Sequence, residues 1–548
     1  MKIIYLLSAC LLLGGCPDDG TDPSEVVFEL RETELPGVFE VVTTGMDPNA
    51  GYLFECEDGQ SGAPTILEGL WLAARDRVEI DTKCYLKGTT DTGASRGTSP
   101  RTLRQGMLET QAQLLDPTGD SGLDAWERRA LGSQLEAPLP DGISHLVHRD
   151  ERRRLVVRSA RGQAIWARQW SSEGLSHVQV ESEGDDPCGG IPRCVERLFG
   201  VFDNPKAPDL VAIPEPQTAL GSHAAEHGDL SATSSQAAFL AWGAGVQPGA
   251  QEANMAAVDL APTLAAALGL GYTLGRDRDG ALNWTQFKRV DGVARDDLIT
   301  AGSAEQVIIV SIDGLSVNAL ATMMEQSEGF KQLRDEGLWL SDGLLTGYPS
   351  KTMPGHHTLD SGLWSGHHGI YDDTLFDRRE NRWLDLLGED VFVGSRARFR
   401  EHAETFHQAL AARPSPTMEG AWSVSAGSPS FIGATTNALE GSGPGGEGWM
   451  NIGREPGFIN LPQAPDWTSG ATYSAWENSI MLAEFTQRIV TGVQVAGKRP
   501  SYTLANLAIY DQIAHQFGPQ SEQAGEALMA LDFMLNRLIA ALKRRDWQ

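Results

Sequence analysis

An apolar run that stops abruptly at Asp-Gly constrains the fold of this chain more than any other feature. The run is Val307-Ile-Ile-Val-Ser-Ile312, and Asp313-Gly314 follows it directly. Short β-branched runs of this kind are typical of strands buried on both faces of a parallel sheet. Ligands of such sheets gather at the carboxyl ends of strands, so Asp313 is placed to hold a cation or a substrate. The alternative is that Asp313 merely caps the following helix.

A second stretch favours the binding site over the cap. It reads Pro349-Ser-Lys351-Thr352-Met-Pro354-Gly-His356-His-Thr358, and its prolines predict a stiff loop around Thr352. A dication lowers the pKa of the groups it coordinates. A hydroxyl held beside a metal-bound carboxylate can therefore lose its proton and attack phosphorus.

A third stretch adds metal ligands. Residues 501–510 predict another buried strand, which delivers Asp511-Gln-Ile-Ala-His515 at its end. A carboxylate and an imidazole four residues apart can converge on one ion. An amphipathic helix from about Ala527 to Leu542 follows, because leucines recur there every three or four residues.

Together with the continuation through His368-Gly369-Ile370, these segments resemble the alkaline phosphatase superfamily, specifically its nucleotide pyrophosphatase and phosphodiesterase branch. The resemblance implies an α/β fold with an alkaline-phosphatase-like mixed sheet flanked by helices. It also implies that Thr352 is the nucleophile and that Lys351 contacts the substrate. The implied zinc ligands in these segments are Asp313, Thr352, Asp511 and His515.

An earlier segment resembles the C-terminal end of the same superfamily, although it precedes the Asp-Gly strand. Residues 239–246 predict a strand, and Asp259 is placed to cap a helix over residues 260–270. By this resemblance His227, in a His-Gly step, matches the last zinc ligand, with His223 as a substitute.

Two departures from the family concern the mechanism. The family's Asp-His-Gly step completes a second zinc site, but no Asp-His dipeptide occurs in this sequence. Where the family has an asparagine that donates to a phosphoryl oxygen, this chain has Asp373. A carboxylate about 4 Å from that oxygen repels it by several kcal/mol at an effective dielectric near 20.

Two arrangements account for the segment order. Either residues 105–290 complete the sheet begun by residues 300–548, in a circularly permuted domain that brings His227 beside Asp511, or the chain is a truncated product. Folding favours the permuted domain, since a truncated one exposes a sheet edge.

The N-terminus predicts export. Met1-Lys2, an apolar run to Leu13 and then Gly-Gly-Cys16 resemble a bacterial lipoprotein signal with a lipidated Cys16. An ordinary secretory signal is the alternative. The chain is then expected in the cell envelope, held to the membrane by a lipid anchor alone. In that oxidising compartment two disulfides are expected, Cys56–Cys84 and Cys188–Cys194.

Residues 116–127 match most of a calcium loop between two helical patterns, which predicts Ca²⁺ as a second cofactor. The candidate ligands are Asp116, Thr118, Asp120, Asp124 and Glu127. The glycine stands one position late, at 122, so a solvated acidic turn is the alternative.

The predicted organisation is a signal over 1–16, a tether over 17–24, a small antiparallel β domain over 25–100, and segments 101–295 and 296–548, the last with an insertion over 414–470. The net charge of −29 argues against a nucleic acid polymer as partner. A small phosphoester or nucleotide is compatible with it, because metals reverse the local charge.

The sequence therefore predicts a cell-envelope phosphoester hydrolase that holds one or two Zn²⁺ and acts on diesters or nucleotide pyrophosphates. The alternative is a catalytically inactive binding or scaffold protein that keeps the fold. A sulfatase is disfavoured, because sulfatases use a Cys or Ser nucleophile where this chain has Thr352.

Overall fold

A computed structural model describes the strands between residues 27 and 102 and most of residues 139–544. Its gaps in the second part lie at 151–153, 172–173, 205, 217, 219–223, 253–254, 277–281, 378–381, 388–394, 396–397, 400–402, 414–419, 433, 438–462, 469–470 and 493–497. The predicted anchor at Cys16, the tether, the calcium loop over 116–127 and His223 lie outside the described residues. The predicted surface insertion over 414–470 is wrong in part, because residues 423–426 and 436–437 form strands of the main sheet; its residues 438–462 lie outside the described residues.

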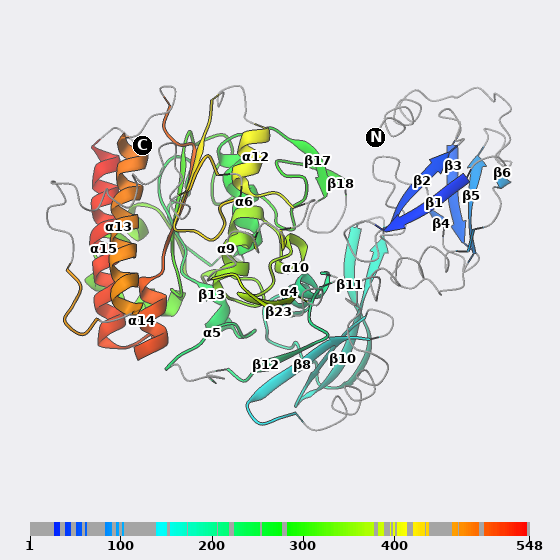
Figure 1. Cartoon of the computed structure of the whole chain (residues 1–548), viewed down its shortest axis with the longest axis horizontal. Helices are drawn as coiled ribbons and strands as arrows, with labels where there is room; N and C mark the ends of the chain where they lie inside the picture. The colour runs from blue at the N-terminus through cyan, green and yellow to red at the C-terminus, as the bar shows by residue number, and fades with distance from the viewer. Residues whose placement is uncertain are drawn as a thin grey trace.

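The main sheet has four parallel strands. Their order is β19 (Val307–Ile312), β26 (Tyr502–Leu507), β24 (Ser423–Ala426) and β25 (Thr436–Asn437). Helices cover both faces, as Figure 1 shows. On one face lie α13 (Ala471–Gly492) and α15 (Glu522–Lys543), and on the other α6 (Leu260–Ala267), α9 (Thr352–Ser361) and α12 (Phe406–Ala412). The predicted α/β class, with a sheet flanked by helices, is confirmed.

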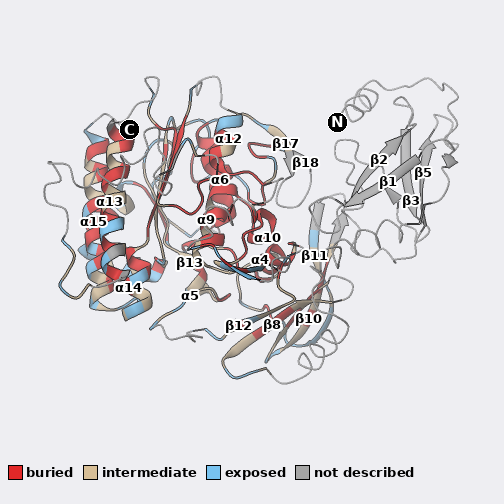
Figure 2. Cartoon of the chain, in the orientation of Figure 1, coloured by how far each residue is buried: buried red, intermediate tan, exposed pale blue. Residues whose placement is uncertain are grey.

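The long helix α15 forms where leucine spacing predicts it. Ser521 caps its first turn by accepting the N–H of Ala524 at 3.1 Å. Its buried and exposed residues alternate along its length (Figure 2), with Leu531 and Leu538 on the buried side. No helix among the described residues is long and apolar enough to cross a membrane.

Residues 236–256 do not extend the main sheet, which corrects the expectation that residues 105–290 complete it. In the described part of the chain they pair instead with residues 338–345 in two three-stranded sheets. One contains β13 (Gln236–Ala237), β21 (Leu344–Leu345) and β16 (Met255–Ala256); the other contains β14 (Leu240–Ala241), β20 (Leu338–Leu340) and β15 (Gly249–Gln251). The strand predicted over 239–246 shrinks to β14, because Gly243 and Gly245 adopt positive φ of 124° and 74°.

Two further expectations about caps and burial are wrong. Asp259 does not cap α6: its oxygens accept the N–H groups of Ala256 and Val293 at 3.0 and 2.9 Å, and a 3₁₀ turn, η3 (Ala257–Asp259), precedes the helix. The residues of β19 after Val307 are only half-buried, whereas β26 beside it is fully buried. The reason is that β19 is the edge strand of its sheet.

A second, antiparallel sheet precedes these elements. Its order is β11 (Gly174–Gly184), β10 (Gly162–Ser171), β9 (Leu155–Ser159), β8 (Ile143–Arg149) and β12 (Leu210–Pro214). Helix α4 (Cys194–Phe202) packs in the same hydrophobic cluster, and the predicted Cys188–Cys194 disulfide is present. The strand β12 precedes His227 in the chain.

The remaining elements are short. They are α5 (Ala232–Ser235), β17 (Thr273–Arg276), β18 (Leu282–Thr285), α7 (Val317–Met323), η4 (Met324–Gln326), α8 (Gly329–Glu336), α10 (Ser365–His368), β22 (Thr374–Asp377), β23 (Arg382–Asp385) and α14 (Ile509–Phe517).

The N-terminal strands pair antiparallel, as their alternating pattern predicts. They are β1 (Val27–Glu32), β2 (Phe39–Thr44), β3 (Gly51–Cys56), β4 (Ser61–Gly62), β5 (Lys83–Thr89), β6 (Ser95–Gly97) and β7 (Arg101–Thr102). The β3–β5 register sets Cys56 directly opposite Cys84. Their side chains lie outside the description, so this disulfide stays a prediction.

Candidate metal centre and nucleophile

The adjacent parallel strands β19 and β26 have their carboxyl ends on the same side of the sheet. Asp313 and Asp511 follow these two ends. The N–H of Asp313 donates to the carbonyl of Leu507 at 3.1 Å, and Asn506 Nδ2 lies 3.5 Å from Asp313 Oδ2. Gly314 has φ +73°, and a Cβ there would lie 2.8 Å from Asp511 Oδ1. The Asp-Gly step therefore needs its glycine both for backbone conformation and for the close approach of Asp511.

Asp313 does not cap the following helix, so that alternative is excluded. The N-cap of α7 is Ser316, whose hydroxyl accepts the N–H of Ala319 at 3.2 Å. The carboxylate of Asp313, which is half-buried, is thus available at the sheet edge for another purpose.

Three predicted ligands, His227, Asp511 and His515, come together in one cluster. One ligand atom from each lies within 4.8 Å of the others. The Nε2 atoms of His227 and His515 lie 3.3 and 3.4 Å from Asp511 Oδ1. Asp511 and His515 sit one turn apart on helix α14, which places them on the same face. The structure thus sets His227 beside Asp511, as the permuted arrangement predicts, although 284 positions separate the two residues in the chain.

The backbone fixes which nitrogen each imidazole presents to the cluster. His227 Nδ1 lies 2.5 Å from the carbonyl of Ser350, and His515 Nδ1 lies 2.8 Å from the carbonyl of Ala225. A carbonyl only accepts hydrogen bonds, so each Nδ1 carries a hydrogen and each Nε2 can present its lone pair. Metal-binding histidines are commonly held in this way by a second partner. Two imidazoles and a carboxylate are a donor set that suits Zn²⁺.

The charge of the cluster favours a cation. Burial disfavours the charged form of His227, but the hydrogen bond and charge of Asp511, with Asp313 contributing, outweigh it and raise its pKa to about 9. The site therefore holds a positive charge readily, whether it arrives as a proton or as a metal ion.

Thr352 is the first residue of helix α9, which corrects the expectation of a stiff loop. Pro354 is compatible with this helix because the first turn needs no intrahelical N–H. His356 ties the turn to the sheet: its Nδ1 lies 2.8 Å from the carbonyl of Thr352 and its Nε2 lies 3.1 Å from Ser311 Oγ on β19. The half-buried Thr352 thus stands at a helix N-terminus that packs beside the strand carrying Asp313.

The two predicted substrate-binding residues, Lys351 and Asp373, are both engaged in hydrogen bonds within the protein. Lys351 Nζ donates to Asp372 Oδ1 at 2.7 Å, and the N–H of Met353 donates to Asp373 Oδ1 at 2.7 Å. Burial, with Asp372 nearby, raises the pKa of Asp373 to about 6. The carboxylate of Asp373 therefore accepts the N–H of Met353, a first-turn amide to which a phosphoryl oxygen would otherwise bond.

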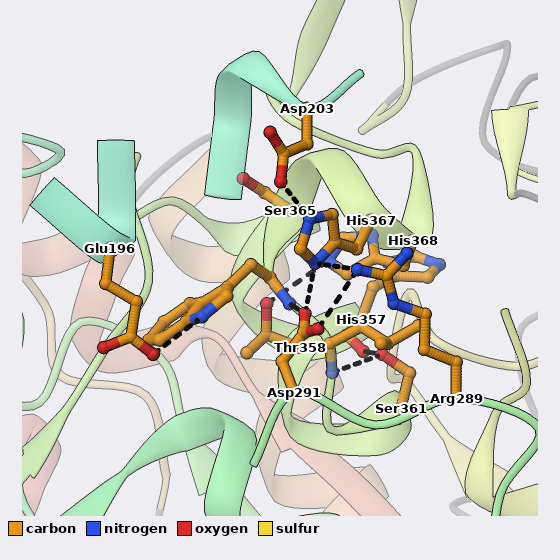
Figure 3. Close-up of polar contacts among 12 residues, drawn as sticks. Glu196, Asp203, Arg289, Asp291, His357, Thr358, Ser361, Ser365, His367 and His368 are labelled. Atoms are coloured by element: carbon orange, nitrogen blue, oxygen red, sulfur yellow. Dashed lines mark hydrogen bonds and ion pairs between the residues drawn. The ribbon is translucent and has the colours of Figure 1, made fainter. Parts of the chain in front are cut away.

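A buried polar network packs behind α9 and was not predicted. Figure 3 shows His367 between Asp203 and Asp291, with Arg289 alongside. His367 Nδ1 lies 2.5 Å from Asp291 Oδ2, and its Nε2 bonds Asp203. The network ties α10, which follows α9 in the chain, to the end of α4. Its members are up to 164 positions apart, which no local pattern in the sequence reveals.

Comparisons with known proteins agree on one family. The sequence model of the type I phosphodiesterase / nucleotide pyrophosphatase family matches residues 307–548. An uncharacterized pyrophosphatase/phosphodiesterase of Schizosaccharomyces pombe is 24% identical over 244 residues, which cover 44% of this chain and 41% of that protein. Ectonucleotide pyrophosphatase/phosphodiesterase family member 3 of Rattus norvegicus is 25% identical over 247 residues, covering 44% of this chain and 23% of that protein.

Among solved structures, murine ectonucleotide pyrophosphatase/phosphodiesterase 5 aligns with a TM-score of 0.25 and 16% identity, over 44% of this chain and 52% of that chain. The chain spans less than half the length of the curated relatives described above. Residues 307–548, less than half of the chain, are therefore similar to the type I phosphodiesterase / nucleotide pyrophosphatase family, which supports the resemblance to that branch of the alkaline phosphatase superfamily.

Proposed function

We propose that the chain is a metal-dependent phosphoester hydrolase in which Thr352 is the nucleophile. The observation that carries the proposal is the convergence of His227, Asp511 and His515, with both Nδ1 atoms held by backbone carbonyls. The names of the relatives, pyrophosphatase/phosphodiesterase, point to diesters or nucleotide pyrophosphates as substrates.

The residues have separate tasks in this proposal. His227, Asp511 and His515 would hold one Zn²⁺, and Asp313 with Thr352 would hold a second. Bound zinc would supply Lewis-acid stabilisation of the phosphoryl oxygens and lower the pKa of the Thr352 hydroxyl. Thr352 Oγ forms a bond to phosphorus as the bond to the leaving oxygen breaks, and water then hydrolyses the phosphothreonine.

The N-terminus of α9 supports the same role. Its helix dipole stabilises negative charge near Thr352. Lys351 adds a cation there: burial disfavours its charged form, but Asp372 raises its pKa, so it stays charged. The proposal also keeps the lipid anchor at Cys16, which places the enzyme at a bacterial cell envelope, and it leaves the calcium loop over 116–127 as a separate proposal.

The test is metal content and hydrolysis of bis-p-nitrophenyl phosphate by the purified mature chain. We expect one or two zinc per chain and a loss of at least about a thousandfold in kcat for Thr352→Ala, because removing the nucleophile removes the covalent route. Thr322→Ala, at an exposed hydroxyl of α7, is the matched control and should leave the rate unchanged. Equal rates for Thr352→Ala and wild type would end the proposal.

A second candidate is a binding protein that retains the fold without turnover. The specific observation in its favour is that Asp373 and Asp372 already occupy the Met353 amide and Lys351. This candidate predicts bound zinc with no rate above that of Thr352→Ala, so the same measurement separates the two.

A further inference from the structure

Strand β26 carries a buried asparagine, Asn506, one residue before its carboxyl end. Only 5% of Asn506 is exposed. It pairs with Ser311 of β19 in the parallel register, and it lies four residues after Tyr502, so Asn506 and Tyr502 share one face of the strand. Tyr502 bonds Asp360 of α9, so this is the face that α9 covers. Asn506 is therefore buried between the sheet and the helix that begins at Thr352.

The amide of Asn506 is only half satisfied. Its Nδ2 lies 3.5 Å from Asp313 Oδ2, which is a long contact for a hydrogen bond. Its Oδ1 is buried and, among the residues that the structure describes, has no hydrogen-bond partner. Exchanging the two amide atoms does not help, because it sets Oδ1 beside a carboxylate oxygen, which also only accepts. A buried acceptor without a partner is destabilising, so this oxygen indicates a bound water or cation.

The charge at this place favours a cation over a water. Within the described part of the chain, no lysine, arginine or histidine pairs with the half-buried carboxylate of Asp313. The imidazoles of His227 and His515 lie instead against Asp511, which follows the neighbouring strand. A water would satisfy Asn506 Oδ1 but leave the carboxylate of Asp313 without a counter-charge. A cation satisfies both groups.

The donor atoms offered here are all oxygens, which decides the kind of cation. They are the carboxylate of Asp313, the amide oxygen of Asn506 and, in the proposed function, the hydroxyl of Thr352. His356 lies beside them, but its Nδ1 is 2.8 Å from the carbonyl of Thr352 and its Nε2 is 3.1 Å from Ser311 Oγ, so the protein engages both ring nitrogens. Zinc sites usually include histidine or cysteine, whereas oxygen ligands alone suit a hard cation such as Mg²⁺ or Mn²⁺. Mg²⁺ in particular is commonly held by one or two carboxylates together with water and substrate phosphate.

We infer that Asn506 is a ligand of a second cation site beside the cluster around Asp511, and that this site takes a hard divalent cation of the Mg²⁺ or Mn²⁺ class instead of a second zinc. The inference rests on the proposed function, in which Asp313 and Thr352 hold the second ion. It adds a third oxygen to that pair, where the family's Asp-His pair is missing from the sequence. The centre then has two chemically different positions, one for zinc and one for a hard cation.

The test measures metal binding without substrate, so it can fail while the proposed hydrolysis stands, and it can succeed in an inactive protein. The metal-free full chain is loaded with one equivalent of zinc and titrated with Mn²⁺, whose free ion is followed by electron paramagnetic resonance. We expect a tight Mn²⁺ site for which Mg²⁺ competes. Asn506→Leu keeps the side-chain volume but removes the oxygen, and should weaken this site at least about tenfold. Asn506→Asp keeps an oxygen there and should bind Mn²⁺ at least as tightly as wild type.

Two controls separate the positions and the fold. His227→Ala should lose the zinc but keep the tight Mn²⁺ site. Asn536→Ala, at an asparagine of α15 that bonds Glu328, should bind both ions as wild type does. The Tm of metal-free Asn506→Leu should not fall below that of wild type, because the substitution removes an unsatisfied buried oxygen. A loss of Mn²⁺ in this variant is then not a loss of fold.

Three results would overturn the inference. Equal Mn²⁺ affinity in Asn506→Leu and wild type would show that the asparagine is not a ligand. No tight Mn²⁺ site in wild type would mean that Oδ1 holds a water only. Two bound zinc ions per chain in millimolar Mn²⁺ and micromolar zinc would show that the second position is a zinc site after all.

Discussion

Asp373 accepts the N–H of Met353 in the first turn of α9, one residue from the candidate nucleophile. Burial raises its pKa to about 6, so above that pH it places a negative charge where the phosphoryl group must bind. Asp373→Asn keeps an acceptor for the amide but removes the charge. We expect the KM for bis-p-nitrophenyl phosphate at pH 8 to fall at least about tenfold, equivalent to about 1.4 kcal/mol.

The pH dependence provides the control for this prediction. In wild type the KM should rise as the pH increases through about 6, because Asp373 then loses its proton. The Asn variant should lack this rise. Asp385→Asn, at an exposed position of β23, should behave as wild type. A KM that is unchanged in Asp373→Asn would show that substrate does not approach the first turn of α9.

The sequence could predict that Asp313 and Asp511 follow neighbouring parallel strands at the same end of the sheet, and that His515 lies one helical turn from Asp511. It could not predict the parts of the site made by the backbone. The carbonyls of Ser350 and Ala225 that orient the histidines belong to residues with no distinguishing side-chain chemistry. His227 was found only through the family resemblance, since nothing in its local spacing links it to position 511.

Asp360, near the end of α9, is completely buried and joins this helix to the main sheet. It accepts hydrogen bonds from Tyr502 of β26 at 2.9 Å and from Ser430 at 2.6 Å. Burial outweighs these bonds and raises its pKa from 3.8 to about 7. The folded state therefore binds more protons than the unfolded state, and stability falls as the pH rises from about 4 to about 7.

Asp360→Asn should remove this pH dependence. At pH 8 we expect the variant to be more stable than wild type by up to about 4 kcal/mol in free energy of unfolding, and near equal to it at pH 4. Urea unfolding at the two pH values measures the difference. A wild-type stability that increases between pH 4 and pH 7 relative to the variant would contradict the sign.

Asp532, which lies on helix α15, caps the N-terminus of a different helix, α8. Its carboxylate accepts the N–H groups of Glu328 and Phe330, each at 2.8 Å. Asp532→Ala should lower the free energy of unfolding by about 2–3 kcal/mol, because it leaves two first-turn amides without their acceptor. Met529→Ala, on the exposed side of the same helix at 39% exposure, is the control and should cost little. Equal effects of the two substitutions in a denaturation experiment would refute the capping role.

For the helices and strands, sequence periodicity predicted whether a segment is a helix or a strand better than it predicted where that segment begins and ends. The helix α15 was predicted from leucines spaced three or four residues apart, and the strand β26 from a continuous apolar run. Both are confirmed, because the apolar residues of each are buried in the core. The predicted strand over 239–246 fails where two glycines with positive φ bend the chain. Thr352 was assigned to a loop because of its prolines, but a proline in the first turn does not oppose a helix.

The molecule as a whole joins segments that are distant in the chain through the cluster of His227, Asp511 and His515 and through buried polar contacts. Arg197 of α4 is completely buried and donates to the carbonyl of Leu230 at 3.1 Å and to that of Gly347 at 3.3 Å. Local strand patterns and the family resemblance predicted the α/β class, yet they could not show that residues 236–256 form sheets of their own with residues 338–345. That outcome depends on pairings between short segments, which carry little signal in the sequence.

The same long-range organisation leads to a prediction about zinc. His227 lies before the main sheet in the chain, whereas Asp511 and His515 follow its strand β26. Zinc bound by all three would stabilise the docking of the two segments, by about 2.7 kcal/mol at a hundredfold excess over Kd. The Tm of the metal-free chain should rise when zinc is added and fall again with EDTA. His227→Ala should lose most of this rise, whereas His148→Ala, on β8, should keep it. If His227→Ala gained as much stability from zinc as wild type, the histidine would not be a ligand and the segment before β19 would contribute no side chain to the centre.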